Sequence, residues 1–175
     1  MNGHTLTLGL VAGLAMAGLA RHRKGSAARG SFTRGRAGAW THNEGFQGTG
    51  EEIIGTLDED PVGTIYLFRS PTQLNSVLRR EEYSTFSGLP RGKTGWLGAI
   101  ELPEDARGFG IGTQIVTEML EKARSLGARS VVLHADSYKS KRFWSKMGFT
   151  VVEMRKADLQ KGLWMTPMMR VLEDR

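Results

Sequence analysis

Apolar runs and amphipathic stretches alternate along the chain after residue 60, which predicts strands and helices in turn. The runs at 64–69 (TIYLFR), 96–102 (WLGAIEL) and 130–135 (SVVLHA) are apolar over strand lengths. The uninterrupted apolar run at 130–135 is typical of a strand in a parallel pair. Residues 149–155 (FTVVEMR) and 164–172 (WMTPMMRVL) are expected to be two closing antiparallel strands.

Three helices are predicted between these strands. The first follows Ser70 and Pro71, which suit the N-cap and the first helical position. The second covers residues 113–126 and ends before Gly127, a residue typical of helix ends. The third is a short helix over residues 139–147. The apolar face of the second helix is formed by Ile115, Met119, Leu120 and Ala123.

Charge separates the first fifty residues from the rest of the chain. A length of 175 residues suits one domain with an appendage. The whole net charge of +6 arises in residues 1–43, which contain basic but no acidic residues. We therefore expect an α/β domain with a mixed sheet over residues 51–175, behind an amino-terminal extension over residues 1–50.

The extension consists of an apolar segment and a basic arm. Residues 5–20 are almost wholly apolar or glycine, but as a helix they reach only about 24 Å, less than the bilayer core of about 30 Å. Membrane contact, burial in a protein assembly and disorder all stay open for this segment. Residues 24–50 are rich in glycine and arginine and are expected to be a linker. The basic residues within 21–36 are a candidate contact for nucleic-acid phosphates.

Composition excludes several kinds of chemistry. The chain has no cysteine, so it has no disulfide framework, cysteine zinc site or thiol nucleophile. No metal site is expected either, because the histidines lie far apart in the sequence. They are His4, His22, His42 and His134. A phosphate-binding loop of the Walker type is excluded, because no Gly-Lys-Ser/Thr follows the glycine-rich segment.

That glycine-rich segment carries the main chemical signal. Residues 107–112 (RGFGIG) lie between the predicted strand 96–102 and the predicted helix 113–126. Glycines allow a ligand to approach the backbone, and the first turn of a helix presents N–H groups without helical partners at the positive end of its dipole. The segment therefore predicts a binding site for a pyrophosphate.

This loop and a second motif resemble the GNAT superfamily of acyl-CoA N-acyltransferases. The family signature Arg/Gln-x-x-Gly-x-Gly/Ala is matched by residues 107–112. The later strand, short helix and Gly-Phe of the family are matched by 133–149 (LHADSYKSKRFWSKMGF), and the resemblance extends over about residues 96–172. It implies a GNAT-like fold, acetyl-CoA as co-substrate, no metal, and direct attack of an amine on the thioester.

The resemblance also implies site residues. The backbone N–H groups of residues 108–113 would hold the pyrophosphate, and a backbone N–H of strand 96–102 would bind the developing oxyanion. The implied cofactor-binding residues are Leu102, Arg107, Gly108, Phe109, Gly110, Ile111, Gly112, Thr113 and Trp144.

Three positions depart from the family's pattern. Trp144 stands where the family has an acidic tyrosine, Ser137 where it often has an asparagine, and strand 96–102 lacks the usual upstream glutamate. For each residue that could take over one of these roles, the alternative is that the residue is only structural or lies in solvent. His134 lies on a predicted buried strand and is expected to be a core histidine. The candidate catalytic residues are Glu101, Tyr138 and Ser137, with Glu104 and Asp105 as further candidate bases.

The sequence leaves three functions open. The leading one is a cytoplasmic N-acetyltransferase that moves an acetyl group from acetyl-CoA to an amine. The second is a catalytically weakened or inactive GNAT-fold module in a large assembly such as a phage virion, with the extension contacting membrane, protein or nucleic acid. The third is an enzyme associated with a membrane through residues 5–20. In the family, one or two helices between the first two strands shape the acceptor pocket; residues 51–95 leave room for only one, so the sequence does not identify the acceptor amine.

Overall fold

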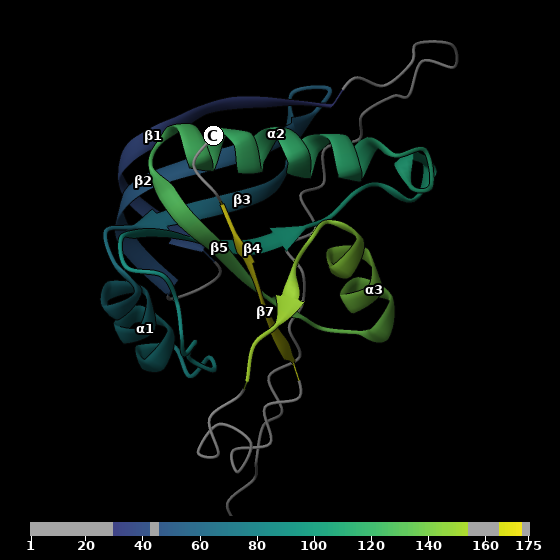
Figure 1. The fold of residues 1–175 in the computed structure, drawn as a ribbon. Helices are drawn as coiled ribbons and strands as arrows, with labels where there is room; N and C mark the ends of the chain where they lie inside the picture. Colours follow the sequence, from purple (N-terminus) through teal and green to yellow (C-terminus); the bar gives the residue numbers. More distant parts are fainter. Residues whose placement is uncertain (1–29, 43–45, 154–164, 173–175) are drawn as a thin grey trace, which may run out of the picture.

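A mixed seven-stranded sheet organises the computed structural model, which describes residues 30–42, 46–153 and 165–172 (Figure 1). The strand order is β1-β2-β3-β4-β5-β7-β6. The strands are β1 (Gly30–His42), β2 (Phe46–Leu57), β3 (Asp60–Phe68), β4 (Lys93–Ile100), β5 (Ala128–Ala135), β6 (Thr150–Val151) and β7 (Thr166–Val171). The helices are α1 (Pro71–Arg80), α2 (Ile111–Ser125) and α3 (Tyr138–Lys146), with a 3-10 turn, η1 (Glu104–Ala106), before α2.

The sheet begins earlier in the chain than the sequence predicts. β1 and β2 pair antiparallel from Gly30↔Leu57 to His42↔Phe46, so most of the segment 24–50, expected to be a linker, lies in the sheet. Glycine-rich strands lack the β-branched and aromatic pattern by which strands are recognised, and they form through backbone pairing with a neighbour. The expected boundary at residue 51 falls inside β2.

The apolar segment 5–20 and the basic residues up to Arg29 lie outside the described residues. Arg34 and Arg36, also assigned to the basic arm, belong to β1. Among the helices that the structure does describe, none has the length and apolar character needed to cross a membrane.

The centre of the sheet matches the sequence prediction closely. β5 is almost wholly buried and lies parallel to β4, as its apolar run indicates. β7 is antiparallel to both β5 and β6, as expected for closing strands. β4 begins three residues before the predicted strand, because Thr94 and Gly95 are buried and pair with β3 instead of forming a loop.

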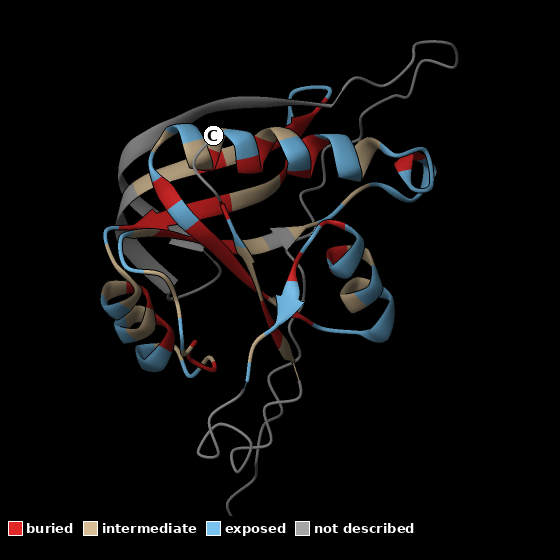
Figure 2. Ribbon diagram, viewed as in Figure 1, coloured by how far each residue is buried: buried red, intermediate tan, exposed pale blue. Residues whose placement is uncertain are grey.

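Helix α2 covers one face of the sheet. Its four predicted core residues, Ile115, Met119, Leu120 and Ala123, are all buried (Figure 2). The helix lies very close to β2 at Gly55, where a Cβ atom would be 2.7 Å from both Ile115 Cγ2 and Met119 Sδ. Only glycine leaves the helix this room, so Gly55 sets how closely α2 approaches the sheet.

Helix α1 covers the opposite face. Leu74 and Leu78 are fully buried in a cluster with Phe68, Phe86 and Trp96. The predicted N-cap is confirmed, because the Ser70 hydroxyl oxygen accepts a hydrogen bond of 3.2 Å from the Gln73 N–H. The Asn75 side chain bonds both the N–H and the carbonyl of Phe86, at 2.9 and 2.8 Å, which ties the loop after α1 to the helix.

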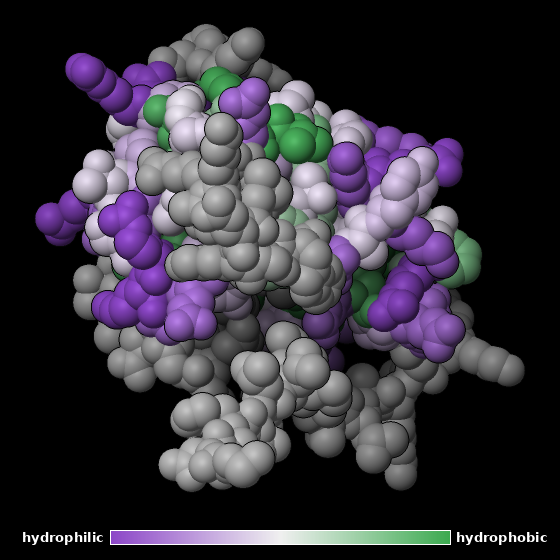
Figure 3. Space-filling model, turned by 90° about the horizontal axis from the view of Figure 1, so that it is seen from below, coloured by the Kyte–Doolittle hydropathy of each residue, from purple (hydrophilic) through white to green (hydrophobic). Residues whose placement is uncertain are grey.

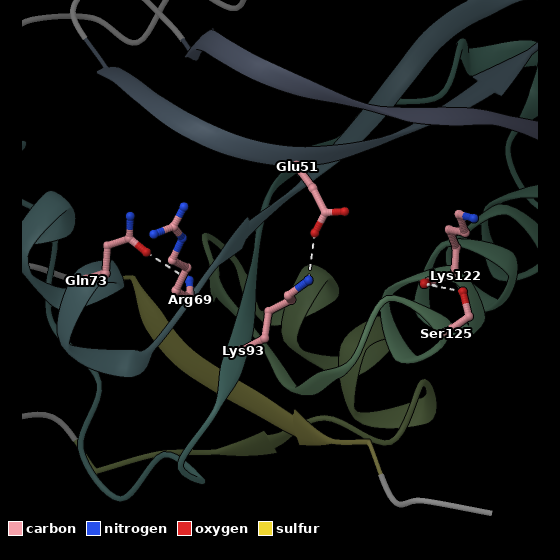
Figure 4. Close-up of polar contacts among 6 residues, drawn as sticks. All are labelled: Glu51, Arg69, Gln73, Lys93, Lys122 and Ser125. Carbon is pink, nitrogen blue, oxygen red and sulfur yellow. Dashed lines mark hydrogen bonds and ion pairs between the residues drawn. The ribbon is translucent and has the colours of Figure 1, made fainter.

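Polar contacts close the ends of these elements (Figure 4). Lys93 of β4 forms a 2.6 Å ion pair with Glu51 of β2, reaching across β3. The Arg69 N–H donates to Gln73 Oε1 at 2.8 Å at the start of α1, and the Ser125 hydroxyl donates to the Lys122 carbonyl at the end of α2. The Arg69 bond ties the start of α1 to the residue after β3, and the Ser125 bond closes the last turn of α2 within the helix.

Candidate active site

Strands β4 and β5 separate over their second halves. Their ladder runs from Lys93↔Ala128 to Trp96↔Val132, although β4 continues to Ile100 and β5 to Ala135 (Figure 1). Residues 97–100 and 133–135 therefore form two diverging strand ends. The carboxyl ends of parallel strands are a common place for ligands in α/β sheets, and this divergence opens the sheet there.

A bulge in β4 lies beside the divergence. Ile65 pairs with Leu97 and Thr64 with Ala99, so Gly98 is an extra residue without a partner on β3. Bulges bend a strand locally and change the direction of its peptide groups. Beyond the bulge, the Glu101 N–H donates to the Val62 carbonyl at 2.8 Å, which keeps β4 attached to β3 while it leaves β5.

The glycine-rich loop presents its amides as the sequence predicts. Gly108 and Gly110 have φ values of 87° and 81°, and the space where a Cβ atom would lie is open at both. Gly110 is the N-cap of α2, and no side chain caps the helix. Within the described part of the chain, the amides of residues 108–113 bond no acceptor, and the first helical bond runs from Gln114 N to the Gly110 carbonyl. The loop therefore fits an anion.

Arg107 and Leu102 connect this loop to the opening in the sheet. Arg107 Nε donates to the Leu102 carbonyl at 2.9 Å, which fixes the start of the loop to the end of the strand. A Cβ atom on Gly112 would lie 3.1 Å from Leu102 Cδ1 and 4.0 Å from Phe143 Cζ. The loop, α2 and α3 thus meet at the diverging strand ends.

The other predicted loop residues differ in exposure. Phe109 is 79% exposed, and Thr113 is exposed in the first turn of α2. Ile111 packs partly against the core. The candidate bases Glu101, Glu104 and Asp105 are exposed, the first just after β4 and the others in η1.

Trp144 is a core residue of α3. It is 7% exposed and packs edge-on against Phe143 and Phe149, at centroid distances of 4.8 and 5.4 Å. Its Nε1 donates a 3.2 Å hydrogen bond to Ser140 Oγ, one helical turn earlier. The indole therefore supports α3 from within, and its N–H is engaged by Ser140 of the same helix.

The two polar candidates at the start of α3 are placed differently. The Ser137 hydroxyl oxygen accepts from the Ser140 N–H at 3.1 Å and is the N-cap of α3. Tyr138 is 80% exposed. Together with the exposed Lys139, Arg142 and Lys146 it belongs to the outer side of the helix. The end of the molecule seen in Figure 3 is correspondingly hydrophilic over much of its described surface.

Sequence analysis missed an aromatic cluster on the α1 face beneath the opening. Its members are Tyr66, Tyr83, Phe86, Trp96 and His134. Trp96 contacts Tyr66 and Tyr83 at centroid distances of 5.9 and 5.6 Å, and His134 contacts Phe86 at 4.8 Å. The aromatic residues can be read from the sequence. The sequence does not show that the loop after α1 returns to contact β5.

His134 is a bonded, half-buried histidine, consistent with the predicted core role. Its Nε2 lies 3.1 Å from the Ser84 carbonyl. A carbonyl only accepts hydrogen bonds, so Nε2 carries the proton. The contact holds the loop after α1 against the separating half of β5.

Tyr66 is the titratable member of the cluster with a shifted pKa. Burial raises the pKa of Tyr66 to about 12, and the nearby Glu52 carboxylate, its partner on β2, adds to the rise. A side-chain hydrogen bond with Thr64 acts in the opposite direction. The phenol is therefore neutral at physiological pH.

We expect Tyr66→Phe to flatten the loss of stability at high pH. The folded state holds the Tyr66 proton more tightly than the unfolded state, so this contribution is complete below pH 10 and is lost as the pH rises toward 12. The free energy of unfolding, measured by urea denaturation between pH 9 and 12, should fall less steeply in Tyr66→Phe. The exposed Tyr138→Phe is the matched control, and an identical slope in wild type and Tyr66→Phe contradicts the prediction.

The model of the acetyltransferase (GNAT) family matches residues 26–149, so the chain belongs to this family. No curated protein matches it. The match begins before β1, in agreement with a sheet that includes residues 30–42 and 46–50.

Solved structures with similar folds include Ard1 from Thermoplasma volcanium, at 18% identity and a TM-score of 0.44 over 70% of this chain and 71% of that chain. The N-acetylglutamate synthase of Neisseria gonorrhoeae, in complex with coenzyme A and N-acetyl-glutamate, is 15% identical with a TM-score of 0.49, over 85% of this chain and 36% of that chain. Naa50 of Arabidopsis thaliana, in complex with a bisubstrate analogue, is 12% identical with a TM-score of 0.44, over 69% of this chain and 72% of that chain.

Proposed function

We propose that the protein is an N-acetyltransferase that uses acetyl-CoA. The observation that supports this most strongly is the set of amides at residues 108–113, which bond no acceptor within the described part of the chain and lie beside the opening between β4 and β5. No group of three or more potential metal-ligating side chains occurs among the described residues. The proposal therefore assigns the chemistry to the acyl thioester and the protein's own groups.

The loop suits a pyrophosphate for three reasons. Gly108 and Gly110 leave room for phosphate oxygens close to the backbone. The amino terminus of α2 adds the positive end of a helix dipole. The Arg107 guanidinium, held by the Leu102 carbonyl, adds a charge beside the loop. In this proposal the pantetheine arm runs past Leu102 into the diverging strand ends.

Positioning supplies much of the proposed catalysis. The amine nitrogen forms a bond to the thioester carbon, and the carbon–sulfur bond then breaks. Holding both reactants in the opening makes this attack effectively intramolecular. Peptide N–H groups near the Gly98 bulge, where β4 has left β5, are the proposed donors for the oxyanion. The exposed Glu101 beside this strand end is the proposed base, acting through water.

The aromatic cluster makes the α1 face the proposed acceptor side. It lies on the sheet face opposite α2, so the acceptor and the cofactor enter from different faces. Tyr83 and His134 are its partly exposed members, and Tyr83 lies in the loop after α1. A single helix, α1, and this loop occupy the described chain between β3 and β4, and they would shape the acceptor pocket.

Calorimetric titration of the full chain with acetyl-CoA tests the proposal. We expect one binding site with a dissociation constant in the micromolar range, a typical value for a substrate of this size. Release of free thiol in the presence of a panel of small amines and peptide amino termini then measures transfer. Absence of binding at millimolar acetyl-CoA contradicts the proposed cofactor and, with it, the enzyme.

One observation favours a second function, a module that binds acyl-CoA without turnover. Trp144 is buried and its N–H is already bonded within α3, and an indole has no useful acid pKa. Acetyl-CoA binding without thiol release from any amine in the panel supports this second function and contradicts the first.

A further inference from the structure

We infer that the Ser140 hydroxyl is the hydrogen-bond donor to the departing CoA thiolate, and that the Trp144 indole positions and polarises it. The inference rests on the proposed function. Tyr138 and Ser137 are the candidates for this role that the sequence suggests. The inference assigns the role instead to Ser140, which the sequence did not single out.

The direction of the hydrogen bond is fixed by chemistry. An indole N–H only donates, so in the 3.2 Å contact Ser140 Oγ is the acceptor. The hydroxyl hydrogen of Ser140 remains available, and within the described residues it is bonded to no acceptor. A hydroxyl that accepts a hydrogen bond becomes a stronger donor through polarisation.

Ser140 lies at the end of α3 that follows the separating half of β5. Ser140 is in the first turn of α3, because its N–H donates to the N-cap Ser137. That turn follows the separating end of β5 after two intervening residues. Phe143, three residues later on the helix, lies near Gly112 and Leu102 at the head of α2. Ser140 is half-exposed, so a ligand in the opening can reach it.

Burial of the indole gives the arrangement its precision. Trp144 is enclosed by Phe143 and Phe149, so its N–H keeps a fixed direction. The alternatives lack this support. Tyr138 is 80% exposed, and Ser137 is exposed and accepts its hydrogen bond from a backbone N–H, not from a buried side chain.

The proposed step is balanced without a further reactant. The new carbon–nitrogen bond forms, the carbon–sulfur bond breaks, and its electron pair goes to sulfur. Ser140 donates a hydrogen bond to this sulfur and keeps its own proton. The attacking group is the neutral amine; its nitrogen gives up one proton through water to Glu101, the proposed base, and solvent later protonates the thiolate. Ser140 therefore lowers the pKa of the bound thiol and speeds departure.

The test measures the thiol of CoA bound to the full chain. Thiolate absorbance is followed against pH for wild type, Ser140→Ala and Trp144→Phe, with free CoA in the same buffer. We expect the thiol in the wild-type complex to ionise at lower pH than in Ser140→Ala by about one pH unit, and Trp144→Phe to lie between them. The exposed Ser145→Ala on the same helix is the control and should match wild type.

Turnover supplies an independent measurement. We expect Ser140→Ala to lower kcat about 10-fold, as for loss of about one pH unit of thiolate stabilisation, with KM for acetyl-CoA unchanged. Equal thiol pKa values in wild type and Ser140→Ala, with CoA bound to both, overturn the inference and leave the proposed function standing. Failure of wild type to bind CoA overturns both.

Discussion

Gly110→Asp is expected to lower the affinity for acetyl-CoA about 100-fold. The substitution places a carboxylate in the open space at the head of α2, where the amides of residues 108–113 face the proposed pyrophosphate. A 100-fold loss of affinity corresponds to about 2.7 kcal/mol. Two like charges about 4 Å apart repel by about 4 kcal/mol at an effective dielectric constant of 20, which is enough to cause this loss. Calorimetric titration with acetyl-CoA measures it.

Gly110→Asn separates charge from shape in this experiment. Asparagine has the same size as aspartate and tolerates the positive φ of residue 110 about as well, so both variants should lose similar stability. We expect Gly110→Asn to bind acetyl-CoA within about 10-fold of wild type. Raised salt should narrow the gap between the two variants, because the repulsion is partly screened. Equal affinities for Asp and Asn at low salt would show that the phosphates bind elsewhere.

Gly55→Ala is expected to destabilise the fold by about 2–3 kcal/mol, the upper part of the range for overpacked cores. The new methyl group would lie 2.7 Å from Ile115 Cγ2 and Met119 Sδ. The methionine side chain can rotate away, but the β-branched isoleucine in a helix has essentially one rotamer. Helix α2 must therefore move outward from β2. Urea unfolding followed by circular dichroism measures the change.

A double mutant tests whether the contact between the new methyl group and Ile115 causes the loss of stability. Ile115→Ala alone removes buried side-chain atoms and should cost about 2–5 kcal/mol. Combined with Gly55→Ala it should cost less than the sum of the two by about 1–2 kcal/mol, because the alanine side chain has no Cγ2. Gly127→Ala is the control for backbone strain alone, since its φ is 83° and no atom lies near its Cβ position; it should cost about 1 kcal/mol. Additive costs for the pair would contradict the close approach.

The sequence predicted those elements whose pattern is local. Helix α2 shows a clear apolar periodicity and a glycine stop, and helix α1 has Ser70 and Pro71 at its start. Strand β5 is buried on both faces, so its apolar run needed no partner to be recognised. Each of these features depends on residues a few positions apart.

Strand β1 depends on pairing with the following strand, β2, and its sequence alone resembles a linker. Its glycine, serine and arginine residues form a strand because β2 supplies backbone partners along its length. The start of β4 is also hidden in the sequence, because a glycine such as Gly95 is typical of a turn. In the fold this glycine fits between Ile65 and Val131, where a Cβ atom would lie within 3.0 Å of both side chains.

The candidate site also has one part that the local sequence predicts and another that depends on strand pairing. The glycine loop was predicted from residues 107–112 because its chemistry is backbone chemistry, which glycine spacing reveals. The opening between β4 and β5 and the bulge at Gly98 arise from registers between strands, which a single sequence does not display. The Ser140–Trp144 contact spans one helical turn, but the burial of Trp144 that holds it in place comes from the packing of α3.

The strand order has a practical consequence for shortened forms of the protein. β7 is the last described strand in the chain, yet it lies inside the sheet between β5 and β6. Its Arg170 also donates to the Met147 carbonyl at the end of α3, at 2.7 Å. A fragment cut where the family match ends, at residue 149, would expose the inner edge of β5 and release that helix end. Deletion series intended to isolate an active domain should therefore keep the chain through Leu172.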